Sequence, residues 1–292
     1  MFIPRKILEE KLRGMLTEDI GEGDVTTSLI ISPETVAEAD VISEEAGIVA
    51  GVEEAEILSE SLGLTARANV KDGDRVKKGQ ILLKIGGNAR TVLVVERTLL
   101  NIVSRMSGIA NATANMIEMI QKTGARTRIA CTRKTAPGLL YFDKKAVLLG
   151  GGDPHRFHLD DMVLIKDNHI AIVGSVEKAV KKTKEKASFS KKIEVEVTRV
   201  EDILPAIHAG ADAIMLDNFS PEHVEEAVAF LKNKKLRERV LLEVSGGITE
   251  KNLLEFVSKG VDIISIGIIT NSTKAFDVSL EIRNVAKKRP CA

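Results

Sequence analysis

After Gly124 the chain alternates short apolar runs with helical segments, and this rhythm limits the possible folds more than any other feature of the sequence. Six runs rich in β-branched residues have the length of strands: ARTRIAC (125–131), MVLIKD (162–167), KIEVEV (192–197), AIMLD (213–217), VLLEVSGG (240–247) and DIISIG (262–267). Helical segments lie between the later runs, at 175–186, 200–209, 221–231 and 250–258. Such alternation predicts an all-parallel sheet.

Two architectures are common for parallel sheets, and the sequence favours one of them. Helices follow the strands and there is no Rossmann glycine fingerprint, so a closed barrel is favoured over an open doubly wound sheet. Six clear strands are fewer than the eight of an ordinary barrel. We therefore expect an α/β protein with an incomplete barrel.

The first third of the chain has a mixed pattern. An amphipathic helix is expected at 1–16, followed by a polar, glycine-containing stretch at 18–27 and by strands joined by a turn at 39–51. The segment 70–87 alternates apolar and polar residues around turns and is similar to the flank of a lipoyl or biotinyl carrier domain. Because no carrier lysine stands in the usual motif, we expect a small β layer used for packing or dimerisation.

A long helix is predicted for 90–122. Its apolar residues recur at steps of three and four: Val92, Val95, Leu99, Ile102, Val103 and Met106. We expect Ser107-Gly108 to break or kink this helix.

The charge balance excludes several classes of partner. Lys and Arg number 42, Asp and Glu number 42, and the formal net charge is zero. No general positive field would therefore draw the protein to nucleic acid or to an anionic membrane. The chain has no Trp and one Tyr, so stacking platforms for single-stranded nucleic acid are disfavoured and the core must be aliphatic.

The cysteines and the lengths of the apolar runs indicate in which cellular compartment the protein is expected. Cys131 and Cys291 form neither a metal-ligand spacing nor a disulfide framework, which favours a reducing compartment. We expect no signal peptide, and the longest apolar run, 263–269, is too short for a membrane span. A cytoplasmic protein is therefore expected, and its many Lys, Glu and Arg residues hint at a thermophilic source.

In a barrel of this kind the functional residues lie where the strands end. The expected ends are Thr132-Arg133-Lys134, Lys166-Asp167, Glu196, Asp217-Asn218, Ser245-Gly246-Gly247 and Gly267. The glycine turns come at two consecutive late strands, where backbone N–H groups and a helix N-terminus can bind an anion. This arrangement predicts a phosphate site.

Two carboxylates, Glu196 and Asp217, end apolar strands and are expected to project into the barrel mouth. Near a phosphate they make sense if Mg²⁺ lies between them and the phosphate oxygens. Glu194 alternates with Glu196, so both should point to the same side of their strand. Because burying two acids is costly unless they are paired, we expect at least one of them to be functional.

Cations form the largest group of candidate residues: Arg105, Arg133, Lys134, His155, Arg156 and Lys166. Arginine makes planar two-point contacts with carboxylates and phosphates, so the group predicts a substrate with several anionic groups. The runs at 181–186 and 232–239 mix both signs and are expected to be solvated. A catalytic zinc is disfavoured, because the histidines lack a zinc-binding motif.

Taken in order, these segments resemble the quinolinate phosphoribosyltransferase family. The resemblance is carried by EDIGEGDVTT (18–27), RMSGIA (105–110), TRKTAPGLL (132–140), GGG and HR (150–156), LIKDNH (164–169), IEVEV (193–197), IMLDNF (214–219), EVSGGI (243–248) and ISIG (264–267). It covers nearly the whole chain.

The resemblance implies a reaction and an architecture. Quinolinate and phosphoribosyl pyrophosphate would give nicotinate mononucleotide, pyrophosphate and CO₂ with Mg²⁺, in de novo NAD biosynthesis. It also implies an N-terminal α/β sandwich at 1–112, joined by 272–292, and an incomplete, seven-stranded type of barrel at 113–271. The assembly would be a homodimer or a higher homo-oligomer with shared active sites.

The resemblance also implies roles for individual residues. Substrate contacts are expected from Thr132, Arg133, Lys134, His155, Arg156 and Lys166, and from Arg105 across the subunit interface. Catalytic roles fall to Lys166, Glu196 and Asp217, of which the two acids would lie at the Mg²⁺. Phosphate contacts fall to Ser245, Gly246, Gly247, Ile266 and Gly267. Two departures from the family pattern, Asp153-Pro154 and Asn271, put the local geometry in question.

Other functions stay open at this point. A related phosphoribosyltransferase that uses nicotinate, or the molybdenum-linked homologue, would lack the pocket for a second carboxylate. A non-catalytic phosphate-ligand sensor would bind ligand without releasing CO₂. A carrier-domain scaffold would carry a lipoyl or biotinyl group.

Overall fold

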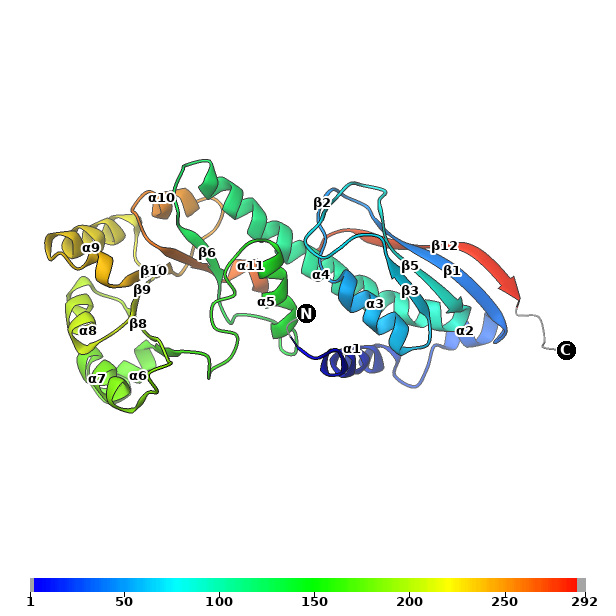
Figure 1. Cartoon of the computed structure of the whole chain (residues 1–292), viewed down its shortest axis with the longest axis horizontal. Helices are drawn as coiled ribbons and strands as arrows, with labels where there is room; N and C mark the ends of the chain where they lie inside the picture. Colours follow the sequence, from blue (N-terminus) through cyan, green and yellow to red (C-terminus); the bar gives the residue numbers. More distant parts are fainter. Residues whose placement is uncertain (1–2, 288–292) are drawn as a thin grey trace. The chain divides into compact units, whose positions relative to one another are not determined.

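The computed structural model describes residues 3–287, so Cys291 lies outside the described part (Figure 1). The chain divides into two compact units. One comprises the residues up to Asn111 together with those from Thr273 onward, and the other is Ala112–Ser272. Helix α4 (Ala89–Gln121) contributes residues to both.

The first unit is built on a four-stranded antiparallel sheet. The order is β12-β1-β5-β3, with β1 at Thr35–Ser43, β3 at Thr65–Ala68, β5 at Ile81–Asn88 and β12 at Val278–Lys287. A two-stranded ribbon pairs β2 (Gly47–Ile48) with β4 (Arg75–Val76). The expected β layer is therefore present, and a strand from the end of the chain completes its edge.

Helices α1 (Arg5–Ile20), α2 (Val25–Ile30) and α3 (Val52–Ser61) complete this unit with the first part of α4. Leu8, Leu12 and Leu16 recur at four-residue steps along α1, and all three are buried. Helix α3 packs against α1 and against strands β3 and β5. The unit is thus a sheet with helices packed on it, as expected for an α/β sandwich.

Helix α4 runs through Ser107-Gly108 without a break, so the expectation that the helix would break there was wrong. The Ser107 hydroxyl exchanges hydrogen bonds with the backbone of Ala50, at 2.9 and 3.1 Å. A Cβ atom on Gly108 would lie 2.2 Å from the carbonyl oxygen of Lys274. The glycine is therefore present for close backbone approach rather than to end the helix.

The second unit contains a six-stranded parallel sheet in the order β6-β11-β10-β9-β8-β7. Its strands are β6 (Arg128–Cys131), β7 (Val163–Ile165), β8 (Ile193–Val197), β9 (Ala213–Asp217), β10 (Leu241–Ser245) and β11 (Ile263–Ile266). Each falls within one of the six predicted runs. The incomplete barrel predicted from the strand count is confirmed.

A seventh segment extends this sheet by a single bridge. Asp153 pairs in parallel with Ala130 of β6, and its backbone exchanges hydrogen bonds with Ile129 and Cys131 at 2.8 and 3.1 Å. Within residues 3–287 no ladder joins this segment to β7. The barrel therefore stays open between them.

Helices follow the strands of the second unit: α5 (Leu140–Leu149), α6 (Asp167–Val173), α7 (Val176–Lys186), α8 (Ile203–Ala209), α9 (Pro221–Asn233), α10 (Leu253–Val257) and α11 (Ile268–Asn271). Two short 3₁₀ helices, η1 (Val200–Asp202) and η2 (Arg237–Arg239), precede α8 and β10. Helices α7, α8 and α9 lie on the outer side of the sheet (Figure 1).

Local capping explains why these helices begin where they do. The side chains of Ser175 and Ser220 each accept a hydrogen bond from the backbone N–H three residues later in the chain. Pro221 is the first residue of α9. The helix expected at 250–258 is shorter, because α10 begins only at Leu253.

Among the described residues, no helix has both the length and the apolar character needed to cross a membrane.

Candidate active site

The carboxyl ends of the parallel strands surround a cavity of about 480 Å³. Eleven of the predicted site residues line it: Thr132, Arg133, Lys134, His155, Arg156, Lys166, Glu196, Asp217, Ser245, Gly246 and Gly247. Nine of them come from β8, β9 and β10 or from the loops that follow β6, β7 and β10, and His155 and Arg156 come from the segment between α5 and β7. Alternation along the strands places Glu196, Asp217 and Ser245 on the inward face.

Three predicted residues do not line this cavity. The side chain of Ile266 is buried at the end of β11, so only its backbone could meet a ligand. A Cβ atom on Gly267 would lie 3.2 Å from the Lys134 side chain and 3.6 Å from the Thr132 hydroxyl, which places Gly267 beside two lining residues. Arg105 lies on α4 in the first unit.

The glycine turn after β10 has a strict steric requirement. Gly246 has a φ of 101°, and a Cβ atom there would lie 2.2 Å from the side-chain oxygen of Asn218 and 2.9 Å from its backbone nitrogen. Gly247 has a φ of 62° and faces open space. The turn is therefore closed on the protein side and open on the cavity side, which suits the close approach of an anion.

The helix N-terminus contributes less to this turn than the sequence indicated. Helix α10 begins six residues after Gly247 and spans only five residues. The turn after β11 agrees better with the expected helix N-terminus, because α11 begins directly after Gly267. The hydroxyl of Thr270 in α11 donates to the backbone oxygen of Lys134 at 2.9 Å, which ties this end of the site to the loop after β6.

The cations of the site are crowded and accessible. Arg133 and Lys134 are exposed, and Arg156 is partly buried. Burial, followed by the positive charge of Arg133, lowers the pKa of Arg156. Crowding of like charges is relieved when an anion enters, so this side of the cavity is prepared for an anionic ligand.

Lys166, which also lines the cavity, is paired with an acid. Its ammonium group hydrogen-bonds the Glu196 carboxylate, which is nearly buried. Lys166 also caps α6, and its backbone N–H donates to Nδ1 of His169 at 2.9 Å. The carboxylate of Asp217 accepts a hydrogen bond of 2.8 Å from the Asn218 amide.

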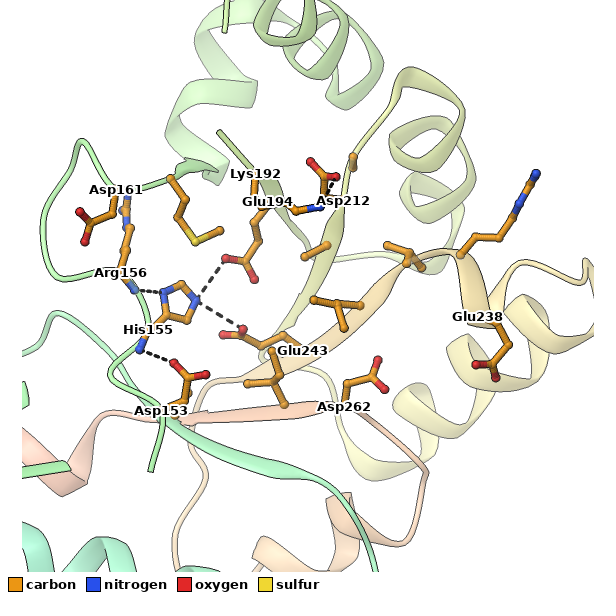
Figure 2. Close-up of a pocket in the computed structure, with 18 of the residues that line it drawn as sticks. Asp153, His155, Arg156, Asp161, Lys192, Glu194, Asp212, Glu238, Glu243 and Asp262 are labelled. Atoms are coloured by element: carbon orange, nitrogen blue, oxygen red, sulfur yellow. Dashed lines mark hydrogen bonds and ion pairs between the residues drawn. The ribbon is translucent and has the colours of Figure 1, made fainter. Parts of the chain in front are cut away.

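His155 lines this cavity, and its ring points between two buried acids, as Figure 2 shows in a view of a neighbouring pocket that His155 also lines. Its Nε2 atom is 3.2 Å from the carboxylate of Glu194 and 3.4 Å from that of Glu243. Burial by itself lowers the pKa of His155, but the hydrogen bonds and charges of the two acids outweigh it and raise this pKa to about 10. The backbone N–H of Arg156 donates to Nδ1 at 2.8 Å, which opposes the rise because only the neutral ring accepts there. Two carboxylates outweigh one amide, so the direction is upward.

Glu194 is the less stabilised of the two acids. Burial, opposed by His155 and reinforced by the charge of Glu243, raises the pKa of Glu194 to about 7. Among the described residues neither of its oxygens receives a hydrogen bond of good geometry. Glu243, by contrast, accepts a hydrogen bond from the Ser265 hydroxyl.

Comparisons with known proteins match both units to one family. The description "Quinolinate phosphoribosyl transferase, N-terminal domain" fits residues 24–107, and "Quinolinate phosphoribosyl transferase, C-terminal domain" fits residues 109–281. The chain belongs to the quinolinate phosphoribosyltransferase family.

Individual relatives agree with this assignment. The probable nicotinate-nucleotide pyrophosphorylase [carboxylating] of Methanothermobacter thermautotrophicus is 45% identical over 94% of this chain and 98% of its own length. The nicotinate-nucleotide pyrophosphorylase [carboxylating] of Rattus norvegicus is 36% identical over 87% of this chain and 84% of its own. The structure of the Francisella tularensis nicotinate-nucleotide pyrophosphorylase superposes with a TM-score of 0.85 at 36% identity, covering 96% of this chain and 98% of that one.

The two departures from the pattern of quinolinate phosphoribosyltransferases have a local explanation. Asp153 precedes Pro154-His155, and its Oδ1 atom accepts a hydrogen bond of 2.7 Å from the His155 backbone N–H. This hydrogen bond holds the turn that leads into His155. Asn271 ends α11, and its side-chain oxygen accepts a hydrogen bond of 2.8 Å from the Ser272 hydroxyl.

Sequence reasoning missed two residues that line this cavity and one buried lysine that contacts the segment before His155. Glu243 and Ser265 line the cavity, and a lone acid two positions before Ser245 in an apolar strand was the available signal for Glu243. Lys144 is fully buried, and its ammonium group donates to the backbone oxygen of Pro154. Burial lowers the pKa of Lys144. In the sequence Lys144 stands in a Lys-Lys pair that is typical of a solvated face.

Proposed function

We propose that the protein transfers the phosphoribosyl group of phosphoribosyl pyrophosphate to quinolinate, releasing pyrophosphate and CO₂ and forming nicotinate mononucleotide for NAD biosynthesis. One observation carries the proposal. A single cavity at the carboxyl ends of the barrel strands is lined by four basic residues, two carboxylates and a glycine turn. We call the basic residues the cationic wall: Arg133, Lys134, His155 and Arg156. The substrates need those three surfaces, because quinolinate carries two carboxylates and the donor carries a phosphate and a pyrophosphate.

Quinolinate would bind on the cationic side. Arg133 and Arg156 supply planar guanidinium groups that match carboxylates, and Lys134 and His155 add further positive charge. Thr132 lies at the start of the same loop, and its hydroxyl accepts the backbone N–H of Lys134 at 3.1 Å. The wall therefore offers partners for both carboxylates of the ring.

The 5′-phosphate of the donor would lie at the two late strands. Ser245, Gly246 and Gly247 form one side of this site, and the backbone of Ile266 and Gly267 forms the other. The open space beside Gly247 supports this assignment, because a phosphate needs room next to backbone N–H groups.

Glu196 and Asp217 would lie beside the ribose. When pyrophosphate departs, the ribose develops the positive charge of an oxocarbenium ion, and nearby carboxylates stabilise it. Lys166 is held by Glu196 and would bridge quinolinate and the donor. Because these three groups would act on the reacting atoms, we propose them as the catalytic residues.

The two acids also suit Mg²⁺. This ion takes oxygen ligands and is usually held by one or two carboxylates together with substrate phosphates, and Glu196 and Asp217 supply such oxygens on the cavity wall. When bound with the donor, Mg²⁺ would neutralise charge on the leaving pyrophosphate.

Decarboxylation then needs no nucleophilic side chain. Once the ring nitrogen is bonded to ribose it is positively charged, so it stabilises the electron pair that stays on C2 when the carboxylate departs as CO₂. A proton then adds to C2 and gives nicotinate mononucleotide. Trapping a covalent enzyme–substrate adduct during productive turnover would contradict this order.

Further parts of the proposal concern the assembly. The two compact units would be the two domains of the enzyme, and the protein would work in the cytoplasm as a homodimer or a higher oligomer. Arg105 would reach the quinolinate of a neighbouring subunit. These statements rest on family membership.

The nearest alternative is a phosphoribosyltransferase that uses nicotinate. It would need a pocket for one carboxylate, whereas Arg133, Lys134, His155 and Arg156 all face this cavity. A phosphate-ligand sensor would not need the two carboxylates near the glycine turn. A direct assay of nicotinate mononucleotide and CO₂ separates these functions.

A further inference from the structure

A polar cluster occupies the inside of the barrel beneath the proposed quinolinate site. It consists of His155, Glu194 on β8, Glu243 on β10 and Ser265 on β11, and we refer to it as the interior cluster. Glu194 and Glu243 are each 1% exposed. Barrel interiors are ordinarily filled by branched aliphatic side chains, and burying two acids costs free energy unless they are paired. Aliphatic packing would therefore be expected here if the cluster served only stability.

The interior cluster fixes the ring of His155 from several directions. Nε2 faces both carboxylates, Nδ1 lies 2.8 Å from the backbone nitrogen of Arg156, and the backbone N–H of His155 donates to Asp153. Figure 2 shows the ring between the two acids. His155 also has a φ of 51°, a backbone conformation that non-glycine residues seldom adopt. The surrounding contacts hold it there.

The ring of His155 borders a second cavity. This second cavity, of about 690 Å³, opens at the amino ends of the strands, and His155, Arg156 and Glu243 line both cavities. The interior cluster is thus the partition between the two. Side-chain orientation at the base of the proposed quinolinate site consequently depends on ion pairs and hydrogen bonds rather than on close packing.

We propose that Glu194 and Glu243 are positioning residues of the phosphoribosyl transfer: they keep a proton on Nε2 of His155 and fix the His155-Arg156 pair for quinolinate. Ser265 supports them by donating to Glu243. This inference rests on the proposed function. The two acids touch His155 and would not touch the substrate.

The consequence is specific to one substrate. His155 and Arg156 belong to the cationic wall, whereas the donor phosphate would lie at the glycine turn. Removing an acid charge beneath His155 should therefore weaken quinolinate binding and leave donor binding nearly unchanged. A purely structural role would instead lower stability and affect both substrates alike.

The test uses Glu243→Gln and Glu194→Gln in the full-length protein. Glu238→Gln is the matched control, because Glu238 lines the second cavity, as Glu194 and Glu243 do, but lies outside the interior cluster. The protein contains 5 histidines, so ¹⁵N-histidine NMR can resolve the tautomer and hydrogen bonding of His155, with His155→Gln identifying its signals. Steady-state kinetics give KM separately for quinolinate and for phosphoribosyl pyrophosphate.

We expect each Glu→Gln change in the cluster to shift the Nε2 signal of His155 and to raise the KM for quinolinate about tenfold or more, since hydrogen bonds to charged groups contribute at that level. The donor KM and the Glu238→Gln control should stay within about twofold of the wild type. Unchanged His155 signals, or equal effects on both substrates, would overturn the proposal. If Glu243→Gln does not fold, Ser265→Ala tests the same chain of contacts and should give a smaller shift of the same kind.

Failure of the proposed function gives a different result. The wild-type protein would then form no nicotinate mononucleotide, while the NMR measurement on the free protein would still report whether the two acids hold the His155 ring.

Discussion

Arg133 is expected to contribute to quinolinate binding and not to donor binding, so its role can be tested separately. It is exposed on the cationic wall, and its charge helps to lower the pKa of Arg156 behind it. We predict that Arg133→Ala raises the KM for quinolinate by at least about tenfold, because a charge-assisted contact to a carboxylate is lost. The donor KM should change far less. Initial-rate measurements with each substrate varied in turn check this, and equal changes in both constants would remove Arg133 from the quinolinate site.

His155 gives a prediction about pH and stability. Its pKa is raised from an ordinary value of about 6.5 to about 10 by the two buried acids. A raised pKa in the folded state means that the folded protein binds the proton more tightly than the unfolded chain. The resulting stability is fully present below about pH 6.5 and is lost as the pH rises toward about 10.

Thermal unfolding of the wild type and of His155→Gln, followed across that range, measures the effect. The wild-type Tm should fall more steeply with rising pH than the Tm of the variant. Parallel curves would show that His155 does not carry the shifted proton.

Gly246 and Gly247 are adjacent but should respond differently to alanine. A Cβ atom on Gly246 would collide with the Asn218 backbone, whereas Gly247 faces open space. We predict that Gly246→Ala lowers stability by about 1–3 kcal/mol more than Gly247→Ala does, because its positive φ carries a similar backbone cost and the backbone of Asn218 must also shift. Gly247→Ala should lose only about 1–2 kcal/mol through its left-handed backbone and should mainly raise the donor KM, because the added methyl group enters the phosphate space. Chemical denaturation together with kinetics distinguishes the two, and equal stability losses would contradict the assignment.

At the level of secondary structure, the strands were the most predictable part of the molecule. Their apolar runs are bounded by turn residues, and β9 at Ala213–Asp217 coincides with its predicted run. That Glu194 and Glu196 share one face of β8 followed from alternation alone. Contacts between distant segments were not predictable, because a sequence does not show which backbone meets Gly108 or which loop buries Lys144.

Helix α4 allows a direct test of the close-approach interpretation of Gly108. Gly108→Ala should lower the free energy of unfolding by about 1–3 kcal/mol or more, because the methyl group would meet the Lys274 carbonyl. Gly14→Ala in α1 is the matched control, since nothing lies within 4 Å of its Cβ position. That control should gain about 0.5–1 kcal/mol through helix propensity. Urea titrations of both variants decide the matter, and a Gly108→Ala protein as stable as the wild type would refute the close contact.

For the molecule as a whole, the balanced charge hides a local imbalance. The net charge of zero correctly describes a surface of mixed sign, yet the cationic side chains Arg133, Lys134 and Arg156 lie on one cavity wall. Composition could not show this, because the clustering depends on which strand ends meet. Order along the chain did show it, since every strand of the barrel ends at the same mouth.

The proposed sharing of sites between subunits is testable by mixing. Arg105→Ala and Asp217→Asn should each be nearly inactive. If Arg105 serves a neighbouring site, mixed oligomers of the two variants contain one intact site, and activity should reappear after the subunits exchange. Activity that never exceeds the sum of the two variants alone would place Arg105 in its own subunit's site or outside the reaction.

The central claim is the reaction itself, and one assay tests it most directly. The wild-type protein is incubated with carboxyl-labelled quinolinate, phosphoribosyl pyrophosphate and Mg²⁺, and labelled CO₂ and nicotinate mononucleotide are measured together. We predict that the two appear in equal amounts, that neither forms without the donor, and that nicotinate in place of quinolinate gives little product. Turnover of nicotinate at a comparable rate, or donor binding without any release of CO₂, would contradict the account.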